Sequence, residues 1–209
     1  LSIGVGFETP NVFGKLTGME NLDFFRALYA GPTEEPRALL ERVGLAEDAN
    51  RRAADYSQGM KMRLGFCRAL LNHPRVLFLD EPTTGQDPGN ARRIKEIILD
   101  QKARGRTIFL TTHDMAVARE LCDRVGFLVD GELRLVDSPR DLLVRRGARR
   151  VRVERRATER VEAREFPLDG LGENREFLGL LCEPGLETLH TLEPTLEDVF
   201  IEVTGRRLA

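Results

Sequence analysis

The chain has 209 residues, of which 41% are hydrophobic and 32% charged, so it can bury a substantial core and is too apolar to be disordered. Its 32 Lys and Arg residues nearly balance its 34 Asp and Glu residues, which argues against a nucleic-acid-binding or membrane-surface protein. No apolar run reaches the roughly 20 residues that cross a bilayer, and the cysteines are too few and too far apart to predict a disulfide framework or a zinc cluster.

A short segment near the start of the chain shares a Gly-Lys pair with phosphate-binding loops, but the rest of that motif does not fit. The stretch GKLT at residues 14–17 would need a glycine at position 9, where the chain has Thr9, and its Leu16 lacks the hydroxyl that such a loop offers to Mg²⁺. Thr17 and Glu20 have the spacing of a capping box, which predicts instead a loop that enters a helix over residues 17–30.

Helices and strands then alternate along the chain. The periodicity predicts helices over 36–44, 57–72, 90–105 and 114–123, and strands over 75–80, 107–112, 125–129 and 132–136. The runs RVLFLD and TIFLTT are almost continuously apolar, as expected of strands buried on both faces of a parallel sheet. The pattern therefore predicts an α/β domain with a largely parallel sheet.

After residue 147 the composition changes, and residues 148–209 are expected to form a small accessory domain. Arginines crowd residues 145–164, but acidic residues interleave them and no aromatic residue accompanies them, which favours a solvated strand or helix face over a nucleic-acid patch. These acids are Glu154, Glu159 and Glu162. A last helix is predicted from Thr195, where Asp198 completes a second capping box.

Asp80 and Glu81 are the first candidates for chemistry, because they stand at the carboxyl end of a predicted strand, where open α/β sheets bind ligands. Asp80 suits Mg²⁺, which takes one or two carboxylates together with water and phosphates. Glu81 could orient or deprotonate a water molecule. Alternatively, both acids only cap the loop that follows.

Three further groups are candidates. Ser57, Gln58 and Gly59 begin a helix, whose free N–H groups attract anions, although Ser57 could equally be a plain N-cap. His113 leaves a strand near that of Asp80 and could hydrogen-bond a terminal phosphate, although a lone histidine is more often structural. Asp87 lies in a turn just past the two acids.

The order and spacing of these groups resemble a known family. SQGM at 57–60, LDEP at 79–82, GQDP at 85–88 and TTHD at 111–114 resemble the signature motif, Walker B motif, D-loop and switch histidine of ABC-transporter ATPases. IGVGFETPNVFGKLTGMENL resembles the Q-loop and the start of the helical subdomain, and PTLEDVFIEVTG resembles the tail of the multidrug-export branch. The resemblance covers nearly the whole chain.

The resemblance implies a fold and a domain organisation. Residues 1–147 would be a P-loop-NTPase-like ABC ATPase core with a helical subdomain at about 17–72, and residues 148–209 the accessory domain. The chain would be an ATP-binding, ATP-hydrolysing subunit that works as a homodimer or heterodimer. It would lie at the cytoplasmic face of the cell membrane, bound to an integral membrane permease, with no nucleic-acid partner.

The resemblance also implies a role for each candidate. Asp80 would hold Mg²⁺ through water, Glu81 would polarise the attacking water, and His113 would contact the γ-phosphate of ATP. Ser57, Gln58 and Gly59 would clasp the ATP of the partner subunit. Asp87 would communicate across the dimer interface, and Glu8 would link the nucleotide state to the permease.

Several positions depart from the family pattern. The Walker A loop would precede residue 1, and the first residue is Leu rather than Met, which suggests part of a longer reading frame. Glu8 stands at the Q-loop glutamine, YSQGM replaces LSGGQ, and Gln86 occupies the usual leucine of the D-loop.

Two other functions stay open at this point. A truncated, non-catalytic interaction protein would dimerise without binding its own ATP, and a Walker A sequence directly upstream would exclude it. A DNA-repair ATPase of the same superfamily is disfavoured, because only short helices separate Pro10 from Ser57, where those enzymes insert long coiled coils.

Overall fold

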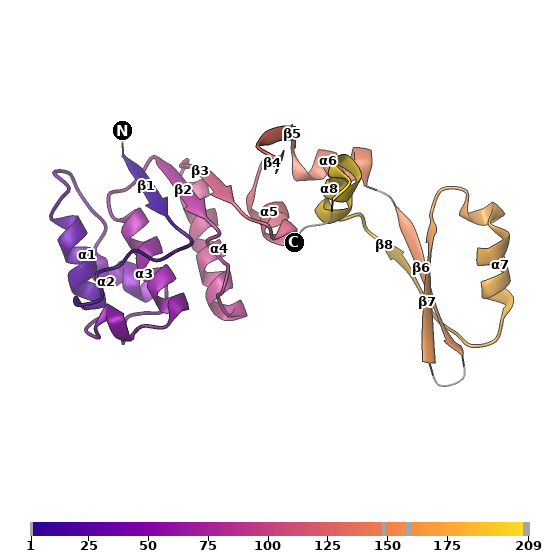
Figure 1. Ribbon diagram of the computed structural model, residues 1–209, viewed down its shortest axis with the longest axis horizontal. Coiled ribbons are helices and arrows are strands. Elements are labelled where there is room, and N and C mark those ends of the chain that lie inside the picture. Colours follow the sequence, from indigo (N-terminus) through magenta and orange to yellow (C-terminus); the bar gives the residue numbers. More distant parts are fainter. Residues whose placement is uncertain (1, 148, 158–159, 207–209) are drawn as a thin grey trace. The chain divides into compact units, whose positions relative to one another are not determined.

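The computed structural model describes residues 2–147, 149–157 and 160–206 (Figure 1). Glu159, one of the acids between the arginines, lies outside the described residues. The chain forms two units, Leu1–His113 and Asp114–Ala209. This division differs from the boundary expected between residues 147 and 148, and the packing of the second unit gives the reason.

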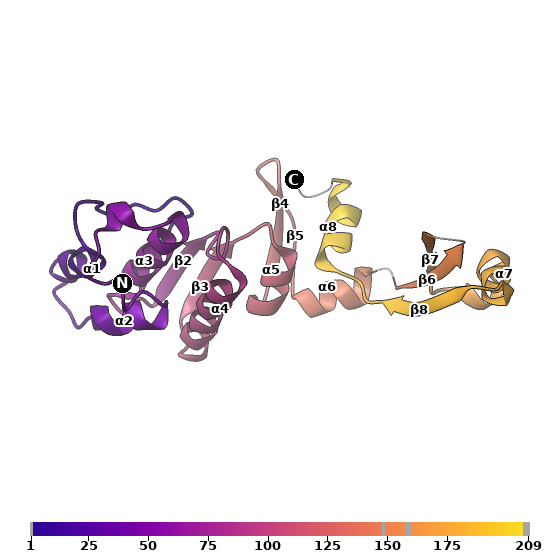
Figure 2. The same ribbon diagram turned by 90° about the horizontal axis from the view of Figure 1, so that it is seen from below.

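The first unit is built on a parallel sheet. Its strands are β1 (Ile3–Gly6), β2 (Val76–Asp80) and β3 (Thr107–Thr111), hydrogen-bonded in the order β1-β2-β3 among the described residues (Figures 1 and 2). β1 packs directly on helix α3 (Gln58–Leu70), and a Cβ at Gly4 would come within 2.0 Å of the carbonyl oxygen of Ala69. Only a glycine allows this approach.

The helices of the first unit follow the predicted pattern. Besides α3 they are α1 (Gly18–Arg26), α2 (Pro36–Arg42), a 3-10 turn (Ala53–Asp55) and α4 (Pro88–Ala103). The capping box of Thr17 and Glu20 is confirmed, because each side chain bonds the main chain of the other. α1, α2 and α3 pack on one another, so residues 18–70 form a helical layer next to the sheet (Figure 1).

One face of this sheet differs from the expectation. Leu77 and Leu79 are buried, but Phe78 is 41% exposed and Phe109 is 61% exposed. The two rings lie 5.9 Å apart and, within the described part of the chain, form an open apolar face. The sequence predicted strands buried on both faces, whereas the first unit leaves the face of Phe78 and Phe109 open and covers the face turned to α3.

The second unit combines two small sheets with helices. In chain order its elements are α5 (Met115–Leu121), β4 (Val125–Val129), β5 (Glu132–Asp137), α6 (Pro139–Arg146), β6 (Arg150–Ala157), β7 (Arg160–Pro167), a 3-10 turn (Leu171–Glu173), α7 (Arg175–Cys182), β8 (Leu186–Leu192) and α8 (Leu196–Thr204). β4 and β5 form the predicted hairpin through Asp130 and Gly131, both with positive φ. In the ranges described, no helix is long and apolar enough to cross a membrane.

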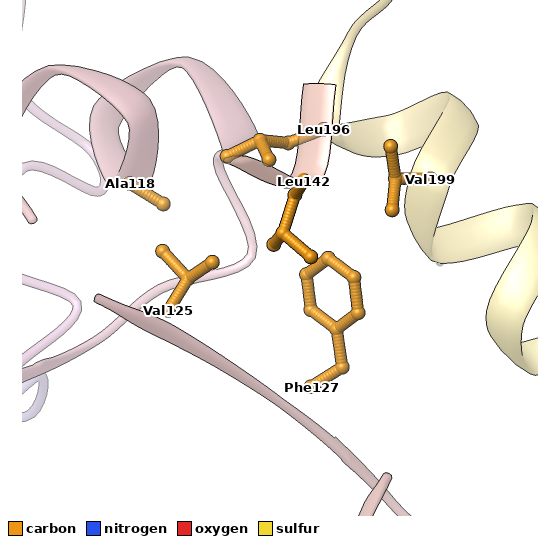
Figure 3. Close-up of a cluster of buried hydrophobic side chains, with 6 residues drawn as sticks. All are labelled: Ala118, Val125, Phe127, Leu142, Leu196 and Val199. Carbon is orange, nitrogen blue, oxygen red and sulfur yellow. The ribbon is translucent and has the colours of Figure 1, made fainter. Parts of the chain in front are cut away.

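The last helix completes the core formed by residues 115–146. Figure 3 shows Leu196 and Val199 of α8 beside Leu142 of α6 and Phe127 of β4, with Val125 and Ala118 completing the cluster. Leu196 and Val199 are fully buried, and Phe200 and Val203 pack at the edge of the cluster. Residues 115–146, which precede β6 in the chain, and α8, which follows β8, therefore share one core. This is why the second unit begins before residue 148.

The β6–β8 sheet has a core of its own. β6 lies between β7 and β8, antiparallel to both, and α7 covers one face. Val151, Val153 and Phe166 are buried there against Phe177 and Leu180 of α7. The arginines of this region pair with neighbouring acids, such as Arg150 with Glu165 at 3.3 Å, so they form the face of a strand, one of the two arrangements expected.

Candidate functional site

The first part of the candidate site is the end of β2. Asp80 is the last residue of the strand, and Glu81 follows it with a φ of 45°. The main-chain N–H of Glu81 donates to the carbonyl oxygen of Thr111 at 3.1 Å, which ties the turn to the end of β3. The chain therefore turns sharply and presents two adjacent carboxylates at the carboxyl edge of the sheet.

The Glu81 carboxylate is held by donors from two loops. The Thr84 hydroxyl donates to Oε2 at 2.8 Å and the Thr112 hydroxyl at 3.3 Å. The main-chain N–H of His113 donates to Oε1 at 2.9 Å, and the Nδ1 atom of the same residue lies 2.8 Å from Oε1. The sequence predicted His113 near this edge, and the structure joins it directly to Glu81.

These contacts set the protonation of Glu81. Partial burial alone would raise the pKa of Glu81, but the hydrogen bonds from His113 and Thr84 outweigh it and lower that pKa below the ordinary value. The side chain is 15% exposed, so one edge of the carboxylate still meets solvent. Glu81 is therefore an oriented, ionised base that can accept a hydrogen bond from water.

Asp80 and Glu8 lie at the same edge of the sheet. The Thr111 hydroxyl donates to Oδ1 of Asp80 and leaves that side chain exposed. β1 runs parallel to β2 with Gly6 opposite Leu79, so β1 ends at the same edge of the sheet as β2, and Glu8 follows two residues later. The parallel register thus brings Asp80, Glu81 and His113 to one edge of the sheet, the edge at which β1 also ends.

The donor set at this edge fits a hard cation. In the part of the chain that the structure describes, no group of three or more His, Cys, Asp or Glu side chains is arranged to hold a metal ion by itself. A single carboxylate with neighbouring hydroxyls is what Mg²⁺ uses when water and phosphates complete its shell. The exposed carboxylate of Asp80, next to the hydroxyl of Thr111, fits that ion.

The second part of the candidate site is the start of α3. Ser57 is its N-cap, and the Ser57 hydroxyl oxygen accepts from the main-chain N–H of Met60 at 3.2 Å. Ser57 and Gln58 are exposed, and the first turn contains no acidic residue. The N-terminus of this 13-residue helix therefore keeps a positive field and N–H groups directed at solvent. Ser57 serves as the N-cap that was foreseen as the alternative, which does not conflict with anion binding.

Asp87 has a structural partner of its own. It is the N-cap of α4, where Oδ1 accepts from the main-chain N–H of Asn90 at 3.0 Å and Oδ2 from the Asn90 amide at 2.6 Å. These bonds from Asn90 hold the pKa of Asp87 below its ordinary value. The carboxylate is exposed, so it can meet a partner while it caps the helix.

Sequence reasoning missed the residues that connect these parts. The Thr84, Thr111 and Thr112 hydroxyls all bind carboxylates of the site, and the only signal was that threonines stand at or shortly after the end of each strand. Gln86 was seen only as a departure from a family pattern. In the structure its Nε2 donates to the carbonyl oxygen of Gly59 at 3.2 Å, which links the turn after Glu81 to the start of α3.

Comparisons with known proteins agree with this geometry. The fold resembles that of a solved ATP-binding subunit of an ABC transporter, with a TM-score of 0.60 and 29% identity over 66% of this chain and 60% of that one. It also resembles a dimeric, post-hydrolysis ATP-binding cassette bound to ADP and Pi, with a TM-score of 0.57 and 30% identity over 66% of this chain and 62% of that one. The fold is therefore an ABC ATPase cassette of the α/β type.

Sequence relatives define the family more closely. Residues 1–84 match a model described as ABC transporter, and residues 149–193 match the fluoroquinolone efflux ABC transporter C-terminal domain. The fluoroquinolones export ATP-binding protein of Mycobacterium tuberculosis is 58% identical over 99% of this chain and 69% of its own length. The Nod factor export ATP-binding protein I of Rhizobium meliloti is 35% identical over 100% of this chain and 67% of its own length. The chain thus belongs to the ABC transporter family, among the ATP-binding subunits of export systems.

Proposed function

We propose that this chain supplies the hydrolytic edge and the signature turn of an ATPase that drives export through a separate membrane permease. The observation that carries the proposal is the Glu81 carboxylate, which is ionised, oriented by Thr84 and His113, and placed one residue after Asp80. A base so fixed is suited to directing a water molecule at a phosphate.

The residues at the carboxyl edge of the sheet have separate roles in hydrolysis. Asp80 would hold Mg²⁺, and Glu81 would orient the attacking water and take up its proton. His113 holds Glu81 in place through Oε1 and would contact the terminal phosphate of ATP. ATP bound with Mg²⁺ supplies the phosphoryl group whose transfer to water releases the free energy for transport.

The start of α3 acts on a second subunit. Ser57, Gln58 and Gly59 direct N–H groups and the positive end of the α3 dipole toward solvent, where they would clasp the ATP held by a partner cassette. A related cassette has been solved as a dimer, and this supports a homodimer or heterodimer here. Asp87, exposed at the start of α4, would contact the partner across that interface.

Glu8 would report the nucleotide state to the permease. It follows β1, which ends at the same edge of the sheet as β2, and the chain continues from it through Phe13 into α1. Movement of Glu8 would therefore shift the loop and helix expected to contact the permease. Such a subunit works on the cytoplasmic side of the membrane, attached to it only through that partner.

The cargo we propose is a fluoroquinolone-type antibiotic. Support comes from the relative that is 58% identical and is described as exporting fluoroquinolones, and from the match of residues 149–193 to the C-terminal domain of such transporters. Cells that carry the intact transporter should accumulate less of a fluorescent fluoroquinolone than cells that carry it with Glu81→Gln. If both kinds of cell accumulate the same amount, and the ATPase subunit and permease are shown to assemble in them, fluoroquinolones are excluded as the cargo.

The substitution Glu81→Gln in the complete ATPase subunit tests the catalytic role. We expect hydrolysis to slow by about 10² or more, because the amide cannot accept the proton of the water, while ATP binding persists. Phosphate release and binding of a fluorescent ATP analogue measure the two effects separately. Glu96→Gln, on the exposed side of α4, is the matched control and should keep the parent rate.

Two outcomes would contradict the proposal. Turnover of Glu81→Gln within about threefold of the parent would exclude Glu81 as the base. Failure of the complete subunit to bind ATP would favour the alternative of a non-catalytic interaction protein.

A further inference from the structure

Gln86 reaches from the turn after Glu81 to the first turn of α3. Its side chain is partly buried, and its Nε2 atom donates to the carbonyl oxygen of Gly59 at 3.2 Å and lies 3.7 Å from the sulfur of Met62. The two partners are 27 residues apart in the sequence. A single side chain thus connects the two parts of the candidate site within one subunit.

Gly59 presents bare main chain to this contact. A Cβ built on Gly59 would lie 3.4 Å from both terminal atoms of the Gln86 amide and 3.6 Å from the carbonyl oxygen of Gly85. The amide therefore packs flat against the glycine as well as bonding its carbonyl. Any displacement of Gln86 is transmitted to the start of α3 by both contact and hydrogen bond.

The turn that carries Gln86 is tied to Glu81. The main-chain N–H of Thr84 donates to the carbonyl oxygen of Glu81 at 3.2 Å, and the Thr84 hydroxyl donates to the Glu81 carboxylate at 2.8 Å. The main-chain N–H of Gln86 donates to the carbonyl oxygen of Thr83 at 3.3 Å. At the far end, Asp87 fixes the turn to α4. Residues 81–87 can therefore move as one piece when the hydrogen bonds of Glu81 change.

We propose that Gln86 is a positioning residue that couples the hydrolytic carboxylate Glu81 to the ATP-clasping turn Ser57–Gly59 of the same subunit. The inference rests on the proposed function and adds its internal regulation. When Glu81 exchanges its bonds to Thr84 and His113 for water, the turn shifts and Gln86 redirects the main chain of Gly59. The affinity of the Ser57–Gly59 turn for the ATP of the partner subunit thereby depends on the hydrogen bonds that Glu81 of its own subunit makes.

The side chain at position 86 decides whether this coupling exists. A leucine, the residue expected there from the family pattern, fills similar space but has no donor for the Gly59 carbonyl oxygen. A glutamate has nearly the shape of glutamine, but an ionised carboxylate would repel that oxygen. Gln86→Leu and Gln86→Glu therefore separate the hydrogen bond from packing.

The experiment measures hydrolysis and binding by the complete ATPase subunit with its permease. Both variants should lower kcat by about three- to tenfold, the effect expected from one neutral hydrogen bond, with Gln86→Glu the lower. The affinity of the single subunit for a fluorescent ATP analogue and its melting temperature should stay at the parent values. Arg92→Leu, on the exposed face of α4, is the control and should keep the parent kcat.

A double-mutant cycle with Thr84→Val tests the route. If Gln86 acts through the turn on Glu81, the loss of kcat in the double variant will be smaller than the product of the two single losses. If the losses of kcat simply multiply in the double variant, the coupling is overturned. It is also overturned if both Gln86 variants keep the parent kcat, or if their melting temperature falls together with the affinity of the single subunit for the ATP analogue. In any of these cases the proposed function still holds if the unmutated subunit hydrolyses ATP. A complete subunit that hydrolyses no ATP overturns both.

Discussion

Glu81 occupies a backbone conformation that a glutamate rarely adopts, because its φ of 45° lies in the left-handed region. Such a residue costs roughly 1–3 kcal/mol and persists only where its surroundings fix it. Here the hydroxyls of Thr84 and Thr112 and the main chain of His113 bind its carboxylate. The strain and these bonds together hold Oε2 between the two neighbouring loops and turn Oε1 toward His113.

The depressed pKa of Glu81 makes the stability of the fold depend on pH. A carboxyl group whose folded pKa lies below its ordinary value of 4.5 contributes stability above that pH and loses it as the pH falls through the folded pKa. The melting temperature of the parent should therefore fall more steeply below about pH 4.5 than that of Glu81→Gln, which has no charge to lose. Scanning calorimetry of both proteins from neutral to acid pH measures the difference. Parallel curves would show that the bonds of Glu81 do not favour its ionised form.

Some residues of the site could be predicted from the sequence, and others could not. Asp80, Glu81 and His113 were expected near one another because parallel strands end at the same edge, and this needs only strand order. The partners Thr84 and Gln86 depend on the conformation of a turn with positive φ at Glu81 and Gly85. No periodicity signals such a turn, so the contact of Gln86 with Gly59 appears only in three dimensions.

At the scale of elements, local signals predicted helix starts better than they predicted burial. Both capping boxes are present, because a cap depends on residues three positions apart. Leu22 lies in α1 and is buried, but Leu28, inside the helix predicted over residues 17–30, is 66% exposed because α1 ends at Arg26. Burial depends on what packs against an element, and that partner is distant in sequence.

Helix α8 shows the same limit and leads to a prediction. Its start at Thr195 was predicted, but its partners α5 and α6 lie more than 45 residues earlier in the chain. Leu196→Ala should destabilise the second unit by about 2–5 kcal/mol, because it opens a cavity in the cluster of Figure 3. Val144→Ala, on a side chain of α6 that is 77% exposed, is the control and should change little.

Urea unfolding of the whole chain measures this effect, with the two units followed by separate probes because they need not unfold together. If Leu196→Ala costs no more than Val144→Ala, α8 is not an integral part of the core.

At the scale of the whole molecule, the exposed apolar residues around α1 form the surface expected to meet the permease. Phe13 and Phe24 are each 46% exposed, and Leu28 and Tyr29 lie close by in the chain. The Phe13 ring lies 5.1 Å from that of Phe24 and 5.7 Å from that of Phe25. The main chain of Phe13 is fixed on both sides by the buried Asn21 amide. Leu16, three residues after Phe13, is only partly exposed.

The fixed main chain and half-exposed ring of Phe13 give the last prediction. Phe13→Asp should abolish co-purification of the ATPase subunit with its permease, because it places a charge in an apolar docking surface, as at interface anchors in general. The cost to the fold should stay near 1 kcal/mol, since the substitution loses partly exposed ring contacts and leaves the Asn21 bonds in place. Leu178→Asp, on a side chain of α7 that is 42% exposed, is the matched control and should co-purify normally. Pull-down and melting temperature are measured on the same preparations. A Phe13→Asp subunit that unfolds, or one that still co-purifies, would show that this ring serves the fold rather than the permease.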